Sequence, residues 1–241
     1  MTEVTHIMPK DIEAESMRII GEELGEIEIS PEKLPIVKRV IHTSADFDYA
    51  HTLRFSNDAV ERGLAALKKG CTIVTDTNMA RTGISQPGLQ KLGASKVCFM
   101  ADADVAEAAK KKKMTRATAS MDKACTLKGP LIIAIGNAPT ALIRLHELIQ
   151  ANQIHPDLVI GVPVGFVNVV AAKELIMTSG VPYIVAVGRK GGSNIAAAIC
   201  NALIYTLTRP YQWNEKGSYG CFFSCETTDF CYNKHLSLIH I

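Results

Sequence analysis

Apolar residues in the N-terminal part of the chain recur at the spacing of a helix face. They predict a first helix between Pro9 and Gly25 and a second that begins near Pro31, since proline is favoured in the first turn of a helix. A third helix is expected to run through Leu67, and Gly70 ends it. The chain is therefore expected to begin with a helical segment.

After this segment the pattern changes to short runs of β-branched residues separated by helical spacing. Such near-continuous apolar runs are typical of strands buried on both faces of a parallel sheet. Five strands are expected, at residues 71–76, 96–100, 130–136, 157–162 and 183–188, with helices at 103–113, 140–152, 166–179 and 193–207. Repeating strand–helix units predict a three-layer, doubly wound α/β sandwich with a five-stranded, mainly parallel sheet. The strand order stays open.

Polar and glycine-rich segments follow the expected strands. In a doubly wound sheet the ligand crevice lies beyond the carboxyl ends of the strands. The N–H groups of the helix starts there favour carboxylate or phosphate groups. Four such segments on one edge predict a ligand with several anionic arms: residues 76–83, 136–140, 163–166 and 188–193.

The pattern of strands and helices ends near Leu207. Beyond about Tyr211 the chain holds its only tryptophan, three of its seven cysteines and three of its seven phenylalanines. Cys221, Cys225 and Cys231 have a spacing that suggests metal, but no metal site is expected because the segment fits no fold pattern. We expect one domain over residues 1–208 and an atypical tail, residues 209–241, that is not part of the fold.

The composition is that of a globular protein without a strong charge bias. Hydrophobic residues make up 47% and charged residues 21% of the chain, and the formal net charge is +2. This balance gives no electrostatic case for binding nucleic acid or an anionic membrane. The N-terminus lacks the regions of a signal peptide, and no apolar run approaches the roughly 18–20 residues of a membrane span. We expect a cytoplasmic protein.

The densest polar chemistry lies in residues 40–49, directly behind the stripe of the second predicted helix. His42 stands there with two hydroxyls and two carboxylates, and Arg39 lies three residues earlier on the same helix face. One interpretation is structural: a histidine at a helix end, with Thr43, Ser44 and Asp46 capping the next element. The other is chemical: a proton donor that acts near neutral pH. The residues alone leave both open.

Standard motifs of several enzyme classes do not occur in the sequence. Residues 188–193 resemble a phosphate loop only loosely, and no G-x-G-x-x-G follows the first expected strand. Neither G-x-S-x-G nor H-E-x-x-H occurs. Nucleotide binding through a standard motif, hydrolase chemistry and zinc-protease chemistry are therefore disfavoured.

Several segments, taken in order, resemble the precorrin-8X methylmutase family, which includes the cobalt-precorrin-8 methylmutases. The resemblance covers roughly residues 9–208 without a break and ends past Leu207. It rests on Ile12-Glu13-x-x-Ser16-Met17-x-Ile19-Ile20, Val37-Lys38-Arg39-Val40-Ile41-His42-Thr43-x-Ala45-Asp46, Ile73-Val74-x-Asp76-x-x-Met79-x-x-Gly83-Ile84, Thr115-Arg116, Ile135-Gly136-Asn137-Ala138-Pro139-Thr140, Pro163-Val164-Gly165-Phe166 and Gly188-x-Lys190-Gly191-Gly192-Ser193.

The resemblance implies an isomerase of cobalamin biosynthesis. The family shifts a methyl group from C11 to C12 of a corrin-type macrocycle, which gives hydrogenobyrinate or, with cobalt in the ring, cobyrinate. The family's catalytic histidine matches His42, and a methyl shift within one molecule needs no redox cofactor. The substrate is a tetrapyrrole-derived ring with several carboxylate arms, and family members are homodimers with active sites near the subunit interface. The substrate-binding residues implied are Ser16, Arg39, Thr43, Met79, Arg116, Asn137, Lys190 and Gly191; Phe166 is our own addition, as a lining for the apolar face of the ring.

Two other functions are weighed against this one. A non-catalytic carrier of a corrinoid or other tetrapyrrole on the same fold would not require His42. It would keep the basic groups of the rim, the sheet edge formed by residues 76–83, 136–140, 163–166 and 188–193. A generic α/β enzyme that acts on a sugar acid or a nucleotide would bind ATP or NAD. The residues do not distinguish a substrate with cobalt from one without, because the macrocycle itself would hold the metal.

Overall fold

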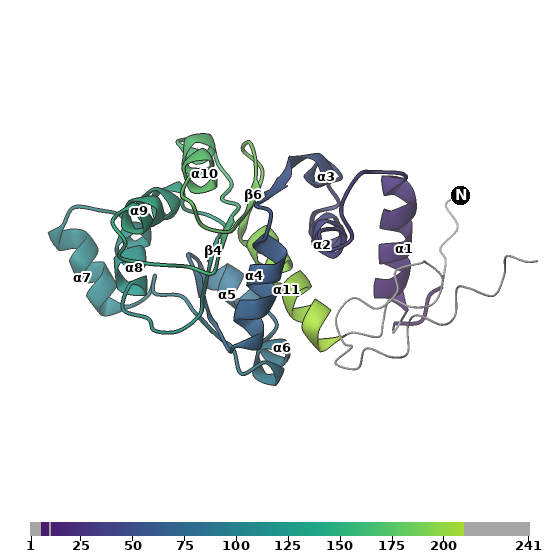
Figure 1. Cartoon of the computed structure of the whole chain (residues 1–241), viewed down its shortest axis with the longest axis horizontal. Helices are drawn as coiled ribbons and strands as arrows, with labels where there is room; N and C mark the ends of the chain where they lie inside the picture. The colour runs from purple at the N-terminus through teal and green to yellow at the C-terminus, as the bar shows by residue number, and fades with distance from the viewer. Residues whose placement is uncertain (1–5, 10, 210–241) are drawn as a thin grey trace, which may run out of the picture. The chain divides into compact units, whose positions relative to one another are not determined.

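The computed structural model describes residues 6–9 and 11–209 (Figure 1). The boundary expected at residue 208 falls at the end of the last helix, α11 (Ser193–Thr208). The expected tail lies outside the described residues except for Arg209, whose guanidinium lies 4.0 Å from the centre of the Tyr205 ring. Within the described ranges, no helix has the length and apolar content to cross a membrane.

A six-stranded sheet forms the centre of the fold. Its strand order is β1–β6–β5–β4–β2–β3, and every neighbouring pair is parallel except β1 with β6. The strands are β1 (Leu53–Phe55), β2 (Thr72–Thr75), β3 (Ser95–Val97), β4 (Leu131–Ile135), β5 (Leu158–Gly161) and β6 (Tyr183–Ala186).

The expectation of five strands was wrong by one. The five predicted strands are present with slightly shorter bounds, and β1 is the sixth. Its three residues include a single buried side chain, Leu53, so no apolar run marks it in the sequence. Pairing with β6 at the sheet edge makes this segment a strand, and that contact joins residues more than a hundred positions apart.

The predicted helices are confirmed, and four short ones were missed. The predicted set comprises α1 (Ile12–Leu24), α2 (Leu34–Ser44), α4 (Ala59–Lys68), α7 (Ala103–Lys111), α9 (Pro139–Gln150), α10 (Val169–Met177) and α11. The missed set comprises α3 (Tyr49–Thr52), α5 (Asn78–Gly83), α6 (Gln86–Lys91) and α8 (Arg116–Ala124). Three of these follow a hydroxyl N-cap that accepts a backbone N–H: Thr77, Ser85 and Thr115.

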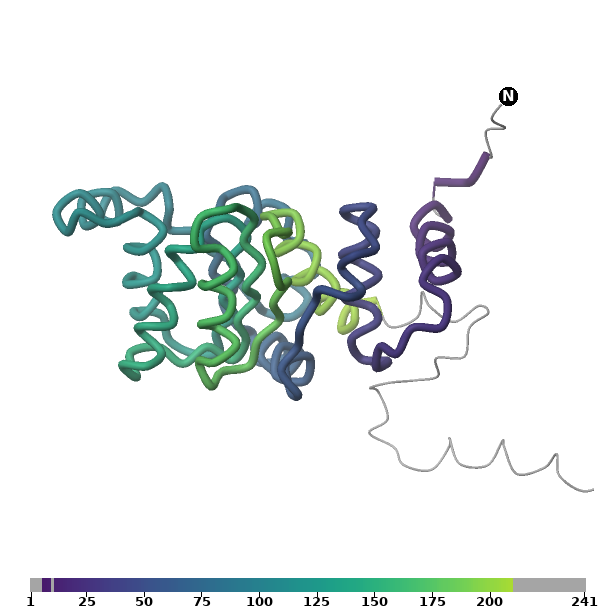
Figure 2. The backbone as a smooth tube through the Cα atoms, turned by 90° about the horizontal axis from the view of Figure 1, so that it is seen from above, coloured from purple at the N-terminus to yellow at the C-terminus, as the bar shows by residue number. Residues whose placement is uncertain are grey.

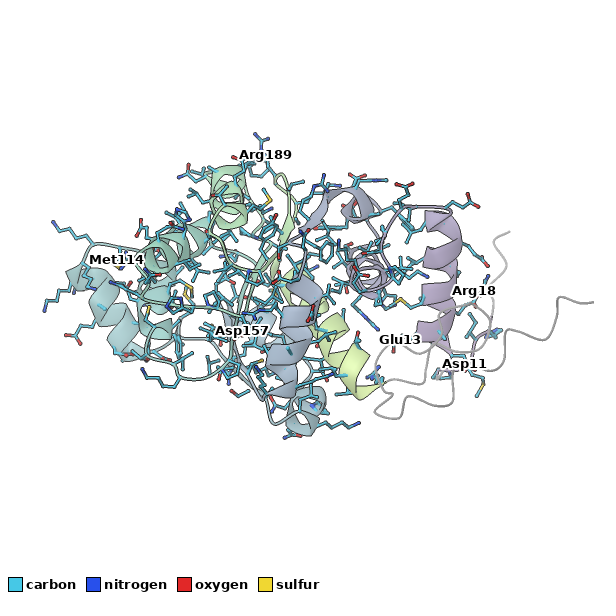
Figure 3. The ribbon with its side chains drawn as sticks, viewed as in Figure 1. Asp11, Glu13, Arg18, Met114, Asp157 and Arg189 are labelled. Atoms are coloured by element: carbon cyan, nitrogen blue, oxygen red, sulfur yellow. The ribbon has the colours of Figure 1, made fainter. Side chains whose placement is uncertain are left out.

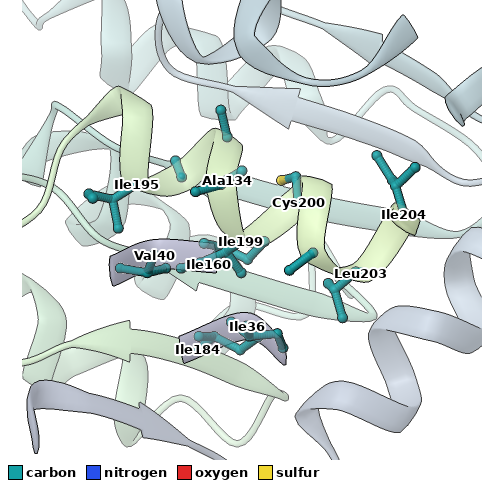
Figure 4. Close-up of a cluster of buried hydrophobic side chains, with 14 of the residues drawn as sticks. Ile36, Val40, Ala134, Ile160, Ile184, Ile195, Ile199, Cys200, Leu203 and Ile204 are labelled. Carbon is teal, nitrogen blue, oxygen red and sulfur yellow. The ribbon is translucent and has the colours of Figure 1, made fainter. Parts of the chain in front are cut away.

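Helices cover both faces of the sheet, which is the middle of three layers. One core packs α2, α4, α5, α6 and α11 against one face, and the other packs α8, α9 and α10 against the opposite face. Successive side chains of a strand point to opposite faces of the sheet, and this separates the two cores. Ile132 of β4 belongs to the first core and Ile133 to the second. Figure 4 shows part of the first core, where Ile36 and Val40 of α2 meet side chains of α11.

Two helices at the start of the chain extend the first face outward. Helix α2 packs along α11, and α1 packs on α2 through Met17 and Ile20. Figures 1 and 2 place α1 and α7 at opposite ends of this arrangement. The N-terminal helical segment predicted from the sequence is therefore an added layer over α11.

The order of the strands creates a switch point between β2 and β4. The connection from β2 to β3 passes through α5 and α6 on the first face, whereas β4 connects to β5 through α9 on the second. The chain therefore leaves these neighbouring strands in opposite directions. In open α/β sheets, ligands bind in the crevice at such a point, beyond the carboxyl ends of the strands.

Candidate active site

A buried carboxylate joins the two loops at the switch point. Asp76, which follows β2, is fully buried, and its Oδ1 accepts the N–H of Gly136 at 2.9 Å. Its Oδ2 accepts the N–H groups of Asn137 at 2.8 Å and Ala138 at 2.7 Å. Burial raises the pKa of Asp76, and the three N–H donors oppose that shift because they favour the charged form. The carboxylate therefore fixes the loop that leads into α9.

The loops after β4, β5 and β6 pack together without room for side chains. A Cβ on Gly136 would lie 2.7 Å from the carbonyl oxygen of Gly192, and one on Gly191 would lie 2.1 Å from that of Val162. Next to them, the hydroxyl oxygens of Thr77 and Ser193 are 2.8 Å apart. The rim is thus a continuous chain of contacts from the β2 loop to the start of α11.

His42 lies in the last turn of α2, at the rim end of that helix. Its imidazole is exposed and has no hydrogen-bond partner among residues 6–9 and 11–209. His42 is one of the groups that lower the pKa of the Glu13 carboxyl on α1. A histidine in this setting is free to contact a ligand.

The hydroxyls beside His42 bond to the helix itself. Thr43 donates to the carbonyl oxygen of Arg39 at 2.9 Å, and Ser44 donates to that of Val40 at 2.8 Å. Both hydroxyls therefore bond back to α2 and do not cap the start of the next helix, α3, as the structural interpretation expected. Thr43 remains exposed, so its oxygen can still accept a hydrogen bond from a ligand.

Lys190 connects the segment after His42 to the loop after β6. Its Nζ lies 2.7 Å from Oδ2 of Asp46 and 2.5 Å from Oδ2 of Asp48. The hydrogen bond from Lys190 lowers the pKa of Asp46, and the two carboxylates raise that of Lys190. All three side chains are at least partly exposed, so this link contributes little to stability but brings Lys190 to the same rim as His42.

Arg39 already has a protein partner. Its Nη2 lies 2.6 Å from Oε1 of Glu13, and its guanidinium stands 5.1 Å from the centre of the Tyr205 ring. Burial would raise the pKa of Glu13, but Arg39 together with Arg209 and His42 holds it below its usual value. Ser16, one turn after Glu13, donates to the carbonyl oxygen of Ile12. The structure therefore pairs Arg39 with Glu13, a residue that sequence reasoning did not single out for a role of its own.

A second group of predicted residues lies on the other face of the sheet. Arg116 opens α8, and Asn137 lies just before α9; both are exposed. Thr115 and Thr140 join the starts of these two helices, with their hydroxyl oxygens 3.0 Å apart. Arg116 also lines an open hollow between α7 and α8, together with Lys110 and Lys113.

The structure does not bring the two groups together. His42 and Arg39 belong to a helix of the first core, whereas Arg116 and Asn137 adjoin helices of the second. Figure 3 labels Glu13, the partner of Arg39, and Met114, two residues before Arg116, far apart in the view. Met79, on α5 of the first face, is 71% exposed.

Two residues with structural roles at the rim were missed by sequence reasoning. Asp76 was placed in a ligand-binding segment and in a family motif, but its role in fixing the loop after β4 was not predicted. Lys173 of α10 is 1% exposed and lies on the apolar stripe formed with Val169, Ala172 and Ile176. A lysine at that spacing was the signal that could have identified it.

Nothing among the described side chains resembles a metal site, since no cluster of three or more His, Cys, Asp or Glu could hold an ion there. Cys221, Cys225 and Cys231 lie outside the described residues. The chemistry available at the rim is therefore that of one exposed imidazole, several cations and backbone N–H groups.

Comparison with known proteins gives one consistent result. A family model described as CbiC, precorrin-8X methylmutase, matches residues 11–206. A cobalt-precorrin-8 methylmutase of Leptospira interrogans is 43% identical over 85% of this chain and 96% of its own length, and one of Salmonella typhimurium is 44% identical over 83% and 96%. The crystal structure of a precorrin-8X methylmutase from Thermus thermophilus superposes with a TM-score of 0.77 at 40% identity, covering 83% of this chain and 98% of that one.

Proposed function

This chain belongs to the precorrin-8X methylmutase family, and we propose that His42 is the proton donor of its methyl shift. The chain is an isomerase of cobalamin biosynthesis that moves a methyl group from C11 to C12 of precorrin-8X or its cobalt form. The product is hydrogenobyrinate, or cobyrinate when the ring carries cobalt. Because the two relatives named above are cobalt-precorrin-8 methylmutases, we infer that the cobalt form is the substrate to test first.

The observation that carries the proposal is the free imidazole of His42. It is exposed, it lacks a hydrogen-bond partner in the described part of the chain, and it lies at the rim near Lys190 and Arg39. The hydroxyls of Thr43 and Ser44 donate to helix carbonyls, and Lys190 binds the carboxylates of Asp46 and Asp48. His42 is therefore the residue of this stretch best able to exchange a proton with a ligand.

One well-placed acid is sufficient for this reaction. The methyl group migrates with its bonding pair while the double bonds of the ring shift, so no atom is gained or lost and no oxidant is consumed. A hydrogen bond or proton from the imidazole to a ring nitrogen withdraws electrons from the conjugated system during the migration. The proton returns to the imidazole when the product is released.

The cations and N–H groups of the rim are proposed to hold the carboxylate arms of the substrate. Lys190 and Arg116 are exposed and can each bind an arm, with Asn137 and the backbone at Gly191 as neutral donors. Arg39 would bind an arm while it keeps Glu13 as its second partner, and Ser16 and Thr43 would add hydrogen bonds. Met79 and Phe166, which are 71% and 82% exposed, would cover the apolar face of the ring.

We further propose that the enzyme is a homodimer in which a second copy completes each site. The support is the position of His42 and Arg116 over opposite faces of the sheet, because one flat macrocycle has to meet both. Val164, Phe166 and Val167 form an exposed apolar group at the rim, as a subunit contact requires. In a two-fold dimer each copy would supply His42 to one site and Arg116 to the other.

Absorption spectroscopy tests the catalytic role of His42. The purified protein should convert precorrin-8X or cobalt-precorrin-8, which changes the absorption spectrum as the conjugation of the ring changes. His42→Ala should lower the turnover rate by roughly 10²–10⁴-fold, the usual contribution of a positioned acid, while the macrocycle still binds. His51→Ala, which removes another exposed histidine in the next helix, is the matched control and should keep full activity.

Two results would contradict this assignment. If His42→Ala turned over substrate as fast as the unmodified protein, the acid would have to be another group. If the unmodified protein bound both macrocycles without changing either one, it would be a carrier on the same fold.

A further inference from the structure

Lys173 of α10 carries a buried charge, and no acidic side chain within residues 6–9 and 11–209 forms an ion pair with it. It is 1% exposed, and its Nζ donates to the carbonyl oxygens of Gly188 and Lys190, each at 2.8 Å. Burial is the only influence that shifts its pKa, which falls to about 8. The ammonium is therefore held by the backbone of one loop alone, residues 188–190.

That loop is the part of the rim proposed to bind the substrate. It carries the Lys190 side chain, which reaches Asp46 and Asp48 beside His42, and it leads directly into Gly191. Two further hydrogen bonds attach it to the loop after β5: Gly165 donates to the carbonyl oxygen of Arg189 at 3.2 Å, and Gly192 donates to that of Val162 at 2.9 Å. The path of residues 188–192 thus decides where Lys190 meets a ligand.

Packing alone does not require an ammonium at this position. The neighbours of Lys173 on the buried face of α10 are apolar, and a side chain of similar length without charge would fill the space with less loss of hydration. The ammonium does what an apolar group cannot. It draws two carbonyl oxygens, which repel each other, towards one point and so bends the loop.

We propose that Lys173 is a positioning residue of the active site, which holds residues 188–190 so that Lys190 and Gly191 meet the substrate. The proposal rests on the proposed function, since it gives Lys173 an effect on binding that passes through those two residues. A purely structural role would instead stabilise the connection between α10 and β6 without an effect specific to the substrate.

Lys173→Met is the informative variant, because methionine keeps most of the length of the lysine side chain and removes the charge. With cobalt-precorrin-8 as substrate we expect KM to rise roughly tenfold and kcat to change much less, since the acid itself is untouched. The thermal midpoint should not fall. Glu174→Gln changes an exposed charge at the next position of the same helix and should leave both constants as they are.

Hydrogen exchange provides a measurement that does not depend on activity. In Lys173→Met the amides of Gly165 and Gly192 should exchange faster, because the loop that they bind has lost its anchor. The amides of Gly136, Asn137 and Ala138, which Asp76 holds, should exchange at the original rate and serve as an internal reference.

A double variant separates positioning from a general loss of structure. If Lys173 acts through Lys190 and Gly191, adding Lys173→Met to Lys190→Ala should raise KM by a smaller factor than Lys173→Met does in the unmodified protein. If the two substitutions raised KM by independent factors that multiply in the double variant, the proposal would be overturned. An unchanged KM in Lys173→Met would overturn it as well. Should Lys173→Met fail to fold, Lys173→Gln, which keeps a neutral donor, takes its place with the same expected results. If the unmodified protein showed no turnover at all, the proposed function would be rejected. The hydrogen-exchange measurement would still show whether Lys173 anchors residues 188–190.

Discussion

At the scale of single residues, the rim uses three ionisable groups in three different environments. His42 is exposed and unoccupied, Asp76 is buried and saturated by backbone N–H groups, and Lys173 is buried and bound to backbone carbonyls. Exposure suits a group that exchanges a proton with substrate. Burial suits groups that hold the main chain, because hydrogen bonds are stronger where water is excluded.

The burial of Lys173 should be visible in the pH dependence of stability. Its pKa is about 8 in the folded protein, against an ordinary value of 10.5 in the unfolded chain. Between these values the unfolded chain binds more protons, so the free energy of unfolding should rise with pH. The gain from this one group is about 1 kcal/mol between pH 7 and pH 9.

The measurement is chemical denaturation of the unmodified protein and of Lys173→Met at both pH values. Subtracting the free energy of unfolding of Lys173→Met from that of the unmodified protein, at each pH, removes the contribution of the titratable groups that both proteins share. A difference that stays constant from pH 7 to pH 9 would mean that Lys173 ionises as an ordinary exposed lysine.

At the scale of elements, the rim depends on loops that approach each other more closely than side chains allow. Gly136, at the end of β4, faces the backbone at the start of α11, and Gly191 faces the backbone that follows β5. Asp76 holds the loop after β4 and Lys173 holds the loop after β6. The active-site edge is therefore rigid in its backbone and variable only in the exposed side chains that it presents.

Gly136→Ala tests this close approach. The added methyl would lie 2.7 Å from backbone atoms of Gly192 and Ser193, and these atoms cannot rotate away. We expect the free energy of unfolding to fall by about 2–3 kcal/mol, the usual cost of overpacking. Gly21→Ala is the control, because its methyl would meet only the flexible end of Lys38 and alanine favours a helix. Equal stabilities of the two variants would show that the loops can separate at no cost.

At the scale of the whole molecule, the sheet separates the proposed acid from part of the proposed binding set. His42 lies on a helix of the first core and Arg116 on a helix of the second. A site assembled from two copies reconciles that separation with one substrate. In such a dimer, the second copy would also cover the exposed apolar side chains of Phe166 and Val167 at the rim.

Mixed subunits test the shared site. His42→Ala and Arg116→Ala homodimers should each be nearly inactive, because every site lacks one group. After exchange of subunits in an equal mixture, about half of the dimers pair the two variants, and each of these has one intact site. Activity should then recover to about a quarter of the original. No recovery, with mixed dimers confirmed by mass spectrometry, would place both residues in the same copy.

The sequence by itself determined the family of this protein, seven of its helices and five of its strands. The apolar spacing of α1, α2, α4 and the later helices, and the β-branched runs of β2 to β6, are local patterns that survive in the folded chain. The ordered motifs identified the methylmutase family, which the matches over residues 11–206 confirm. His42 and the substrate-binding set were named from those motifs and stay predictions.

Only the tertiary structure decided how those elements meet. The strand order is set by which strands become neighbours. The edge strand β1 and the contacts of Asp76 with Gly136 and of Lys190 with Asp46 join residues 60 or more positions apart. Local spacing carries no information on such pairs, because they depend on which strands become neighbours. For the same reason, the separation of His42 from Arg116 and the anchoring of the loop by Lys173 became visible only in the folded chain.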